Sequence, residues 1–235
     1  MNIVLLEDGE SFIPSSDERA EHIRKILHMK AGDNFRAGVI NGATGSASIL
    51  SDDADGIRIA FTAEADGSSL YPLTLIIAQV RPICMKRILR DASSIGVSKV
   101  ILPVSDLGEK SYLSASLYKD REYEKLLLGG AMQAGFTGVP EARITRNAEE
   151  AVTAQDSDVL ILLDNAIGAV ALSSMELEGR SVTLAIGPER GWSERERKLF
   201  MDSGFVPALI GDRILRTETA VPAASVLALS RMGYI

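Results

Sequence analysis

Two segments near the C-terminus combine glycines and polar residues in patterns that suit ligand binding. The first, GPERGWSERE (187–196), contains two glycines and a proline and begins at the last residue of the apolar run SVTLAIG (181–187). Glycines in such a turn let a ligand approach the backbone closely. Ser193 and Glu196 have the spacing of a capping box, which predicts that a helix begins at Glu194. The segment is therefore a candidate binding loop, with an ordinary strand-to-helix turn as the alternative.

This loop lacks the sequences that bind phosphate groups. It contains neither GxxxxGK[ST] nor GxGxxG, the patterns typical of nucleotide and dinucleotide phosphates. Glu189 and Arg190 are also a poor lining for a polyphosphate. The sequence favours a cofactor without phosphates, bound through backbone groups.

The second segment, LIGDRILRTETA (209–220), is the densest group of polar residues in the chain. It joins an expected strand to a final helix that should run from about Thr219 to Met232, with Thr217 or Thr219 as its cap. Charged groups between two apolar stretches need a partner or a function. The alternative is a capped helix with a surface ion pair. The polar side chains concerned are Arg213, Arg216, Thr217, Glu218 and Thr219.

Strands and helices alternate after Pro72, which predicts an α/β domain with a mostly parallel sheet. In such sheets, ligands bind beyond the carboxyl ends of the strands, where 162–168 and both segments lie. Strands are expected at 73–80, 99–104, 142–145, 158–164, 181–187 and 206–211, and helices around Met85–Ala92, 114–134, 148–154 and 194–203.

Residues 1–70 have a different sequence pattern, in which short apolar runs alternate with residues typical of turns. One helix is expected, from Glu18 to His28, and four short strands, which together predict a small β-barrel-like module. The segment DGSSLYP (66–72) is the natural linker. The sequence thus predicts two domains, 1–70 and 71–235.

Composition limits the class of protein. The chain has 235 residues with 46% hydrophobic and 24% charged residues, so it can bury a sizeable core. No membrane span or signal peptide is expected, which indicates a soluble, cytoplasmic protein. One cysteine and two histidines argue against a metal site. Cys84 is expected to be a small buried apolar residue.

The net charge of −7 argues against coating nucleic acid through bulk charge. Local basic clusters could still contact a structured RNA. One cluster lies between Glu21 and Arg36, and another lies between Arg81 and Arg90. The alternative for each is a solvated face of an ordinary element.

The two C-terminal segments resemble the paired motifs of the ribosomal RNA small subunit methyltransferase E family, within the SPOUT superfamily. EHIRKILHMKAGD near the N-terminus is similar to that family's opening motif. The resemblance implies a parallel sheet with a C-terminal trefoil knot that binds S-adenosylmethionine, an N-terminal PUA-like RNA-binding barrel, and a homodimer. The implied reaction is methylation of N3 of one uridine in 16S rRNA of the small ribosomal subunit.

Site residues follow from the same resemblance. Arg216 would stabilise charge on the uracil ring, and Glu218 would orient Arg216 or relay the proton. The implied RNA contacts are Arg24, Lys25, His28, Lys30 and Arg87. The implied cofactor pocket comprises Leu163, Ile186, Gly187, Pro188, Glu189, Gly191, Leu209, Ile210, Gly211, Ile214, Leu215, Thr217 and Thr219.

The chain departs from the family pattern at positions expected to face RNA. Arg190 replaces a glycine, Asp212 a proline, and both Phe136 and His28 an arginine. Two alternatives therefore stay open. One is a SPOUT methyltransferase with another RNA target, such as ribose 2′-O methylation. The other is a non-catalytic RNA-binding assembly protein.

Overall fold

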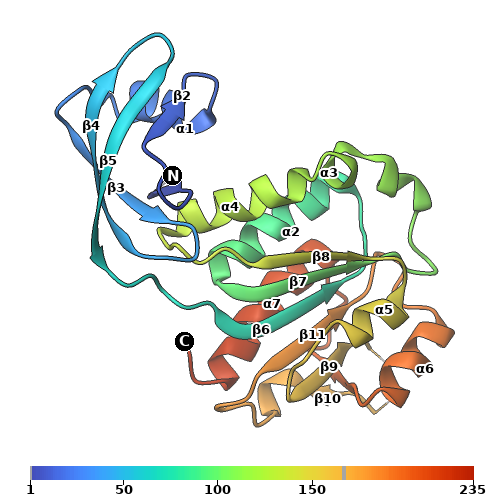
Figure 1. The fold of residues 1–235 in the computed structure, drawn as a ribbon. Coiled ribbons are helices and arrows are strands. Elements are labelled where there is room, and N and C mark those ends of the chain that lie inside the picture. Colours follow the sequence, from blue (N-terminus) through green and yellow to red (C-terminus); the bar gives the residue numbers. More distant parts are fainter. Residues whose placement is uncertain (1, 166–167) are drawn as a thin grey trace. The chain divides into compact units, whose positions relative to one another are not determined.

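A computed structural model describes residues 2–165 and 168–235 of the chain (Figure 1). The chain forms two compact units. The first comprises the chain up to Ser69 together with Leu128–Val139, and the second comprises Leu70–Leu127 and Pro140–Ile235. No helix among the described residues has the length and apolar character needed to span a membrane.

The first unit contains a five-stranded sheet in the order β1-β3-β4-β5-β2. Its strands alternate buried and exposed residues, as expected for a sheet with one face on a core. The sequence patterns miss the short strand β2. The strands are β1 (Val4–Leu6), β2 (Phe12–Pro14), β3 (Asn34–Val39), β4 (Thr44–Asp52) and β5 (Gly56–Ala65).

The helix predicted from Glu18 to His28 is shorter in the structure, and its second half is irregular. Asp17 caps α1 (Glu18–Glu21), and a π-helical turn, His22–Ile26, follows it. His28 adopts a left-handed backbone with φ of 54°, which ends the helical path.

The segment Leu128–Val139 corrects the predicted domain boundaries. The helix α4 (Glu122–Ala134) begins in the second unit, but its last turns belong to the first. There, Ala131 and Met132 pack against Ile3 and Leu5 of the N-terminal strand region. Sequence periodicity places the helix correctly, but it cannot show which core receives the apolar side chains.

The second unit contains a seven-stranded sheet in the order β10-β12-β9-β11-β6-β7-β8, and every neighbouring pair is parallel. The prediction of an α/β fold with a parallel sheet is thus confirmed. The strands are β6 (Tyr71–Ile77), β7 (Val97–Pro103), β8 (Glu141–Thr145), β9 (Val159–Leu163), β10 (Val170–Ala171), β11 (Val182–Ile186) and β12 (Val206–Leu209).

Helices cover both faces of this sheet (Figure 1). On one face, α2 (Pro82–Ile95) and α7 (Thr217–Arg231) contact each other, and α7 also lies against β6 and β11. On the other face, α5 (Ala148–Thr153) and α6 (Glu194–Asp202) pack over a core that includes Trp192 and Phe200. Two short helical segments, η2 (Lys110–Ser114) and α3 (Ser116–Lys119), lead from β7 toward α4, and η3 (Leu172–Ser174) follows β10.

Candidate active site

A cavity of about 800 Å³ lies in the second unit, at the carboxyl ends of β6, β7, β9, β11 and β12. This is the edge at which parallel α/β sheets bind ligands. The loop after each of these strands, or the helix that follows it, contributes to the lining. The lining residues are Arg81, Cys84, 107–109, Tyr112, 163–165, 186–192, Arg197, 208–211, 213–218 and Ala220.

The loop after β11 is held in a tight turn. The backbone N–H of Gly191 donates to the carbonyl of Pro188 at 2.8 Å, and Gly191 has a φ of 70°. A Cβ atom on Gly187 would lie 3.2 Å from Gly191 Cα and 3.1 Å from the nitrogen of Trp192. A side chain at position 187 would therefore crowd the backbone of the loop itself, besides any ligand.

The predicted capping box at the start of α6 is confirmed. Ser193 Oγ accepts from the N–H of Glu196 at 3.1 Å, and Glu196 Oε2 accepts from the N–H of Ser193 at 2.9 Å. The other oxygen of Glu196 accepts from the N–H of Asp106, in the loop after β7, at 2.9 Å. One fully buried carboxylate thus joins two of the loops around the cavity.

Asp106 strengthens the same junction. Its carboxylate accepts hydrogen bonds from Arg195 at 2.8 and 2.9 Å and from Ser193 Oγ at 2.6 Å. These bonds, the one from Arg195 foremost, lower the pKa of Asp106 below its usual range. The loop after β7 is therefore fixed to the N-terminus of α6.

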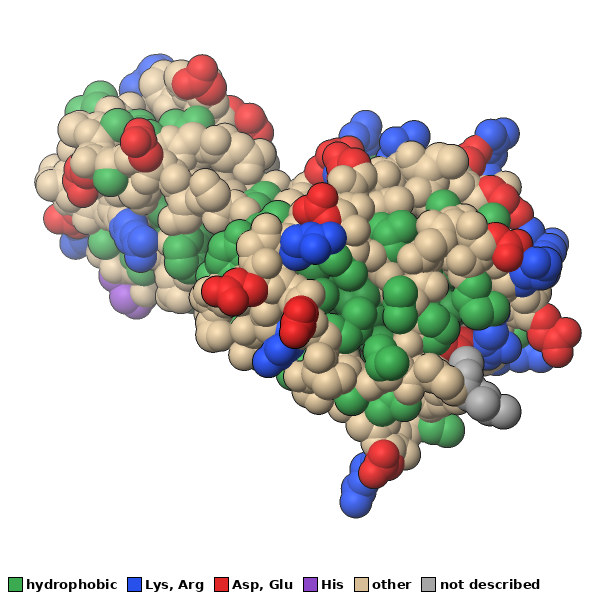
Figure 2. Space-filling view, turned by 90° about the horizontal axis from the view of Figure 1, so that it is seen from below, with side chains coloured by type: hydrophobic (Ala, Val, Ile, Leu, Met, Phe, Trp, Pro, Cys, Tyr) green, Lys and Arg blue, Asp and Glu red, His purple; other side chains and the backbone are tan. Residues whose placement is uncertain are grey.

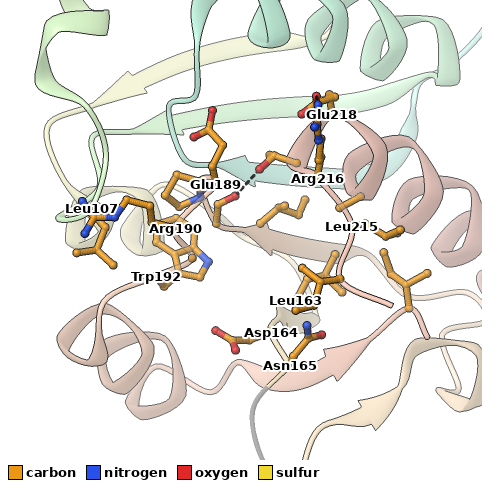
Figure 3. A pocket seen from close by; sticks show the side chains of 18 of the residues that line it. Leu107, Leu163, Asp164, Asn165, Glu189, Arg190, Trp192, Leu215, Arg216 and Glu218 are labelled. Atoms are coloured by element: carbon orange, nitrogen blue, oxygen red, sulfur yellow. Dashed lines mark hydrogen bonds and ion pairs between the residues drawn. The ribbon is translucent and has the colours of Figure 1, made fainter. Parts of the chain in front are cut away.

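The last helix begins two residues before its predicted start. Arg216 is the N-cap residue and Thr217 the first helical residue, with no side chain capping the helix. Instead, Thr217 Oγ1 donates to the carbonyl of Gly187 at 3.1 Å, as the dashed line in Figure 3 shows. This bond joins the second polar segment to the glycine loop.

The structure brings together nearly all of the predicted pocket residues. Thr219 is the exception, because it is exposed and lies outside the cavity lining. Thr217 and Ala220 both line the cavity; they are one helical turn apart, whereas Thr219 points to another side of α7. Thr219, which the resemblance implies as a pocket residue, therefore lies on a face of α7 that does not line the cavity.

Arg216 and Glu218 lie at one side of the cavity with Glu189 (Figure 3). The Arg216 side chain is 85% exposed, and its Nη1 atom is 4.0 Å from Glu218 Oε1. An exposed pair at this separation contributes little to stability. The guanidinium is therefore available to a ligand.

Cys84 corrects a prediction. It is half-buried and lines the cavity, rather than being a buried core residue. Burial, followed by the nearby charges of Glu218 and Glu189, raises the pKa of its thiol, so the neutral form is favoured. The sequence could have indicated this position, because Cys84 closely follows the carboxyl end of the expected strand 73–80, where ligands bind in such sheets.

The opposite side of the cavity holds residues that the sequence analysis did not single out. Asp164 follows β9, and its Oδ2 atom accepts from Arg197 Nε at 2.6 Å. Trp192 lies beside Gly191 in the glycine loop and is 1% exposed. In Figure 3, Leu163, Asp164, Asn165 and Trp192 lie across the cavity from Arg216 and Glu218. Among the described residues, no three His, Cys, Asp or Glu side chains group as a metal site would require.

The predicted RNA contacts divide between the units. Arg24 is engaged internally, because its guanidinium donates to Asp52 at 2.5 and 2.8 Å and to Ser15 at 3.0 Å. Lys25, His28 and Lys30 are exposed in the first unit, whereas Arg87 is exposed on α2 in the second. Arg24 is therefore a poor candidate for an RNA contact, since binding would have to break its pair with Asp52.

The chain is similar in sequence to known RNA methyltransferases. A family model described as an RNA methyltransferase domain matches residues 67–229. The chain is 37% identical to ribosomal RNA small subunit methyltransferase E of Treponema pallidum, over 98% of this chain and 91% of that protein. It is 32% identical to ribosomal RNA small subunit methyltransferase E 1 of Borreliella burgdorferi, over 99% of both chains.

The fold also matches a solved structure. The crystal structure of a ribosomal RNA small subunit methyltransferase E from Neisseria gonorrhoeae, bound to S-adenosyl methionine, superposes with a TM-score of 0.83. It covers 98% of this chain and 97% of its own, at 22% sequence identity. The two proteins share a fold across both units.

The charges around Cys84 predict how its thiol reacts. Because the thiolate is the nucleophile, the raised pKa should shift the rate of alkylation by iodoacetamide to higher pH than for a free thiol. Glu218→Gln removes the carboxylate that raises this pKa more than Glu189 does, and it should move the profile to lower pH. Glu109→Gln, also in the lining, is the matched control and should leave it unchanged. Since Cys84 is the single cysteine, mass spectrometry reads the rate directly; an unchanged profile in Glu218→Gln would contradict the assignment.

Proposed function

Because the chain belongs to the ribosomal RNA small subunit methyltransferase E family, we propose that it methylates N3 of one uridine in 16S rRNA, using S-adenosylmethionine. The observation that carries the proposal is the cavity at five strand ends, where the glycine loop and the start of α7 are joined by the bond from Thr217 to Gly187.

The residues present fit this cofactor. The cavity has no phosphate-binding sequence. Four carboxylates and five arginines line it, so a ligand that carries both positive and negative charge, as S-adenosylmethionine does, meets groups of both signs. The glycine loop, Leu163 and the segment 209–215 would hold the nucleoside and amino-acid parts. When bound, S-adenosylmethionine supplies a methyl group that a nucleophile can displace from sulfur.

The chain's own side chains would prepare the nucleophile. Uridine N3 carries a proton, and it becomes nucleophilic as that proton leaves and negative charge develops on the ring. Arg216, exposed at the cavity, can donate two hydrogen bonds to a uracil oxygen and stabilise this charge. Glu218 is placed to orient Arg216 or to accept the proton. Binding of S-adenosylmethionine and the uridine in one cavity would supply the orientation that in-line transfer requires.

We also infer the remaining architecture from the family. The polypeptide around 187–220 would form a trefoil knot that shapes the cofactor pocket, and the first unit would be a PUA-like barrel. Exposed Lys25, His28 and Lys30 in that unit, and Arg87 in the second, would contact the RNA backbone. With a ribosomal RNA substrate, we propose that the protein acts in the cytoplasm.

Transfer from labelled S-adenosylmethionine to small ribosomal subunits that lack the modification tests the function. Nucleoside mass spectrometry should find 3-methyluridine. A methyl group on the ribose would indicate a SPOUT enzyme with another target, and no transfer to RNA would favour the non-catalytic alternative.

Gly211 offers a direct test of the cofactor site. It lines the cavity, and a Cβ atom at this position meets no protein atom within 4 Å. Gly211→Ala should therefore leave the thermal midpoint unchanged but weaken S-adenosylmethionine binding by roughly tenfold or more through crowding. Gly129→Ala, in open space on α4, is the matched control. Calorimetry showing wild-type affinity for Gly211→Ala would remove residue 211 from the site.

Arg216 should act mainly on the rate of methyl transfer. Arg216→Ala should lower the single-turnover rate on the order of 10²–10³, as expected when a donor to a developing anion is lost. Arg216→Lys should rescue little, because an ammonium cannot reproduce the planar two-donor contact. Cofactor affinity and thermal midpoint should stay near wild type, since the pair with Glu218 is exposed. A loss of stability together with affinity would instead indicate a structural ion pair.

A homodimer is the expected assembly. Figure 2 shows apolar side chains gathered on one face of the second unit. The exposed apolar residues of this unit include Ile83 of α2 and Val226 of α7, two helices that contact each other. Light scattering at micromolar concentration should give twice the chain mass of 25.2 kDa; the mass of a single chain would contradict the dimer.

A further inference from the structure

Trp192 combines two properties that rarely occur together. Its ring is 1% exposed and packs against Phe200, with ring centroids 4.8 Å apart. Yet the residue lines the cavity, and Figure 3 shows its indole nitrogen on the side of the ring that faces the cavity. This nitrogen is buried and has no hydrogen-bond partner among the described residues.

A buried indole N–H normally finds an acceptor, because leaving it unpaired forfeits its bonds to water. Phenylalanine would fill the same aromatic cluster without burying a donor, as Phe200 and Phe205 do. The indole N–H is therefore a donor for which this protein alone provides no acceptor. An acceptor would have to approach from the cavity, the side toward which Figure 3 shows the nitrogen.

The groups beside Trp192 indicate which acceptor fits. The Arg197 guanidinium is close to the glycine loop, since a Cβ atom on Gly191 would lie 3.3 Å from its Nη2 atom. The same guanidinium binds Asp164, whose side chain is 11% exposed and also lines the cavity. A ligand group here meets a neutral donor near a carboxylate. A hydroxyl suits both groups, because its oxygen can accept from the indole N–H while its hydrogen donates to the carboxylate.

We propose that Trp192 is a further cofactor-binding residue, whose indole N–H donates a hydrogen bond to a ribose hydroxyl oxygen of the nucleoside methyl donor, next to the Asp164–Arg197 pair. The inference rests on the proposed function, because it assumes a nucleoside in the cavity. It adds a side-chain contact to a pocket otherwise expected to bind through backbone groups. It also gives the glycine loop a part in recognising the ribose.

The chain has a single tryptophan, so its indole N–H gives one resonance in a ¹H–¹⁵N spectrum. S-adenosylhomocysteine, added to the full chain, should shift that proton downfield as the hydrogen bond forms. Calorimetry under the same conditions measures binding independently. Binding without an indole shift would overturn the role of Trp192 alone. The absence of any binding would overturn the proposed function, and this inference with it.

Variants make the test specific to the N–H group. Trp192→Phe should weaken S-adenosylhomocysteine binding by roughly three- to tenfold, the range for one lost hydrogen bond. Phe200→Leu, which disturbs the same aromatic cluster but keeps the N–H, is the matched control and should bind within about twofold of wild type at a temperature where both variants are folded.

Analogues that lack one ribose hydroxyl identify the acceptor. For the wild type, either the 2′-deoxy or the 3′-deoxy form of S-adenosylhomocysteine should bind more weakly than the parent compound. In Trp192→Phe, that penalty should largely disappear, because the partner is gone. Equal penalties in both proteins would overturn the assignment to a ribose hydroxyl.

Discussion

The parallel direction of every strand in the second unit places five carboxyl ends at one edge of the sheet. Residues far apart in the chain, such as Cys84 and Glu218, therefore meet in one cavity. The two central strands β6 and β11 are almost wholly apolar and buried, so the polar groups at this edge come from the segments that follow the strands. The loops and the helices that follow them carry the polar chemistry of the site, and the sheet fixes their starting points.

Fixed starting points do not by themselves make the loops rigid. Hydrogen bonds between the loops provide that rigidity. Glu196 is fully buried, and its two oxygens accept from the N–H groups of Ser193 and Asp106. Removing a buried carboxylate would leave both N–H groups without partners, which is costly. Thr217 makes the third link, from α7 to the carbonyl of Gly187. The cavity wall is therefore one connected network of hydrogen bonds. The candidate catalytic residues, Arg216 and Glu218, lie at the start of α7.

Sequence reasoning identified the parts of the site that lie within local motifs. The capping box of Ser193 and Glu196 depends on residues three apart, and its prediction is confirmed. Some of the missed residues, such as Tyr112 and Cys84, are brought to the cavity only by tertiary structure. Trp192 belongs to the glycine-loop motif, but the motif does not show that this residue lines the cavity. The segment Leu128–Val139 shows the same limit in the fold, because helical periodicity marks an apolar face without naming its partner.

The charge of the cavity bears on which atom of RNA is methylated. Glu189 and Glu218 lie on the same side of the cavity as Arg216, and burial raises the pKa of the nearby Cys84 thiol, which therefore stays neutral. Carboxylates are weak bases, and they can assist only when the proton to be removed is already acidic. A uridine N3–H is more acidic than a ribose hydroxyl, and its negative charge spreads onto ring oxygens that an arginine can bind. A weak base beside an exposed guanidinium therefore suits the base of a uridine better than its ribose.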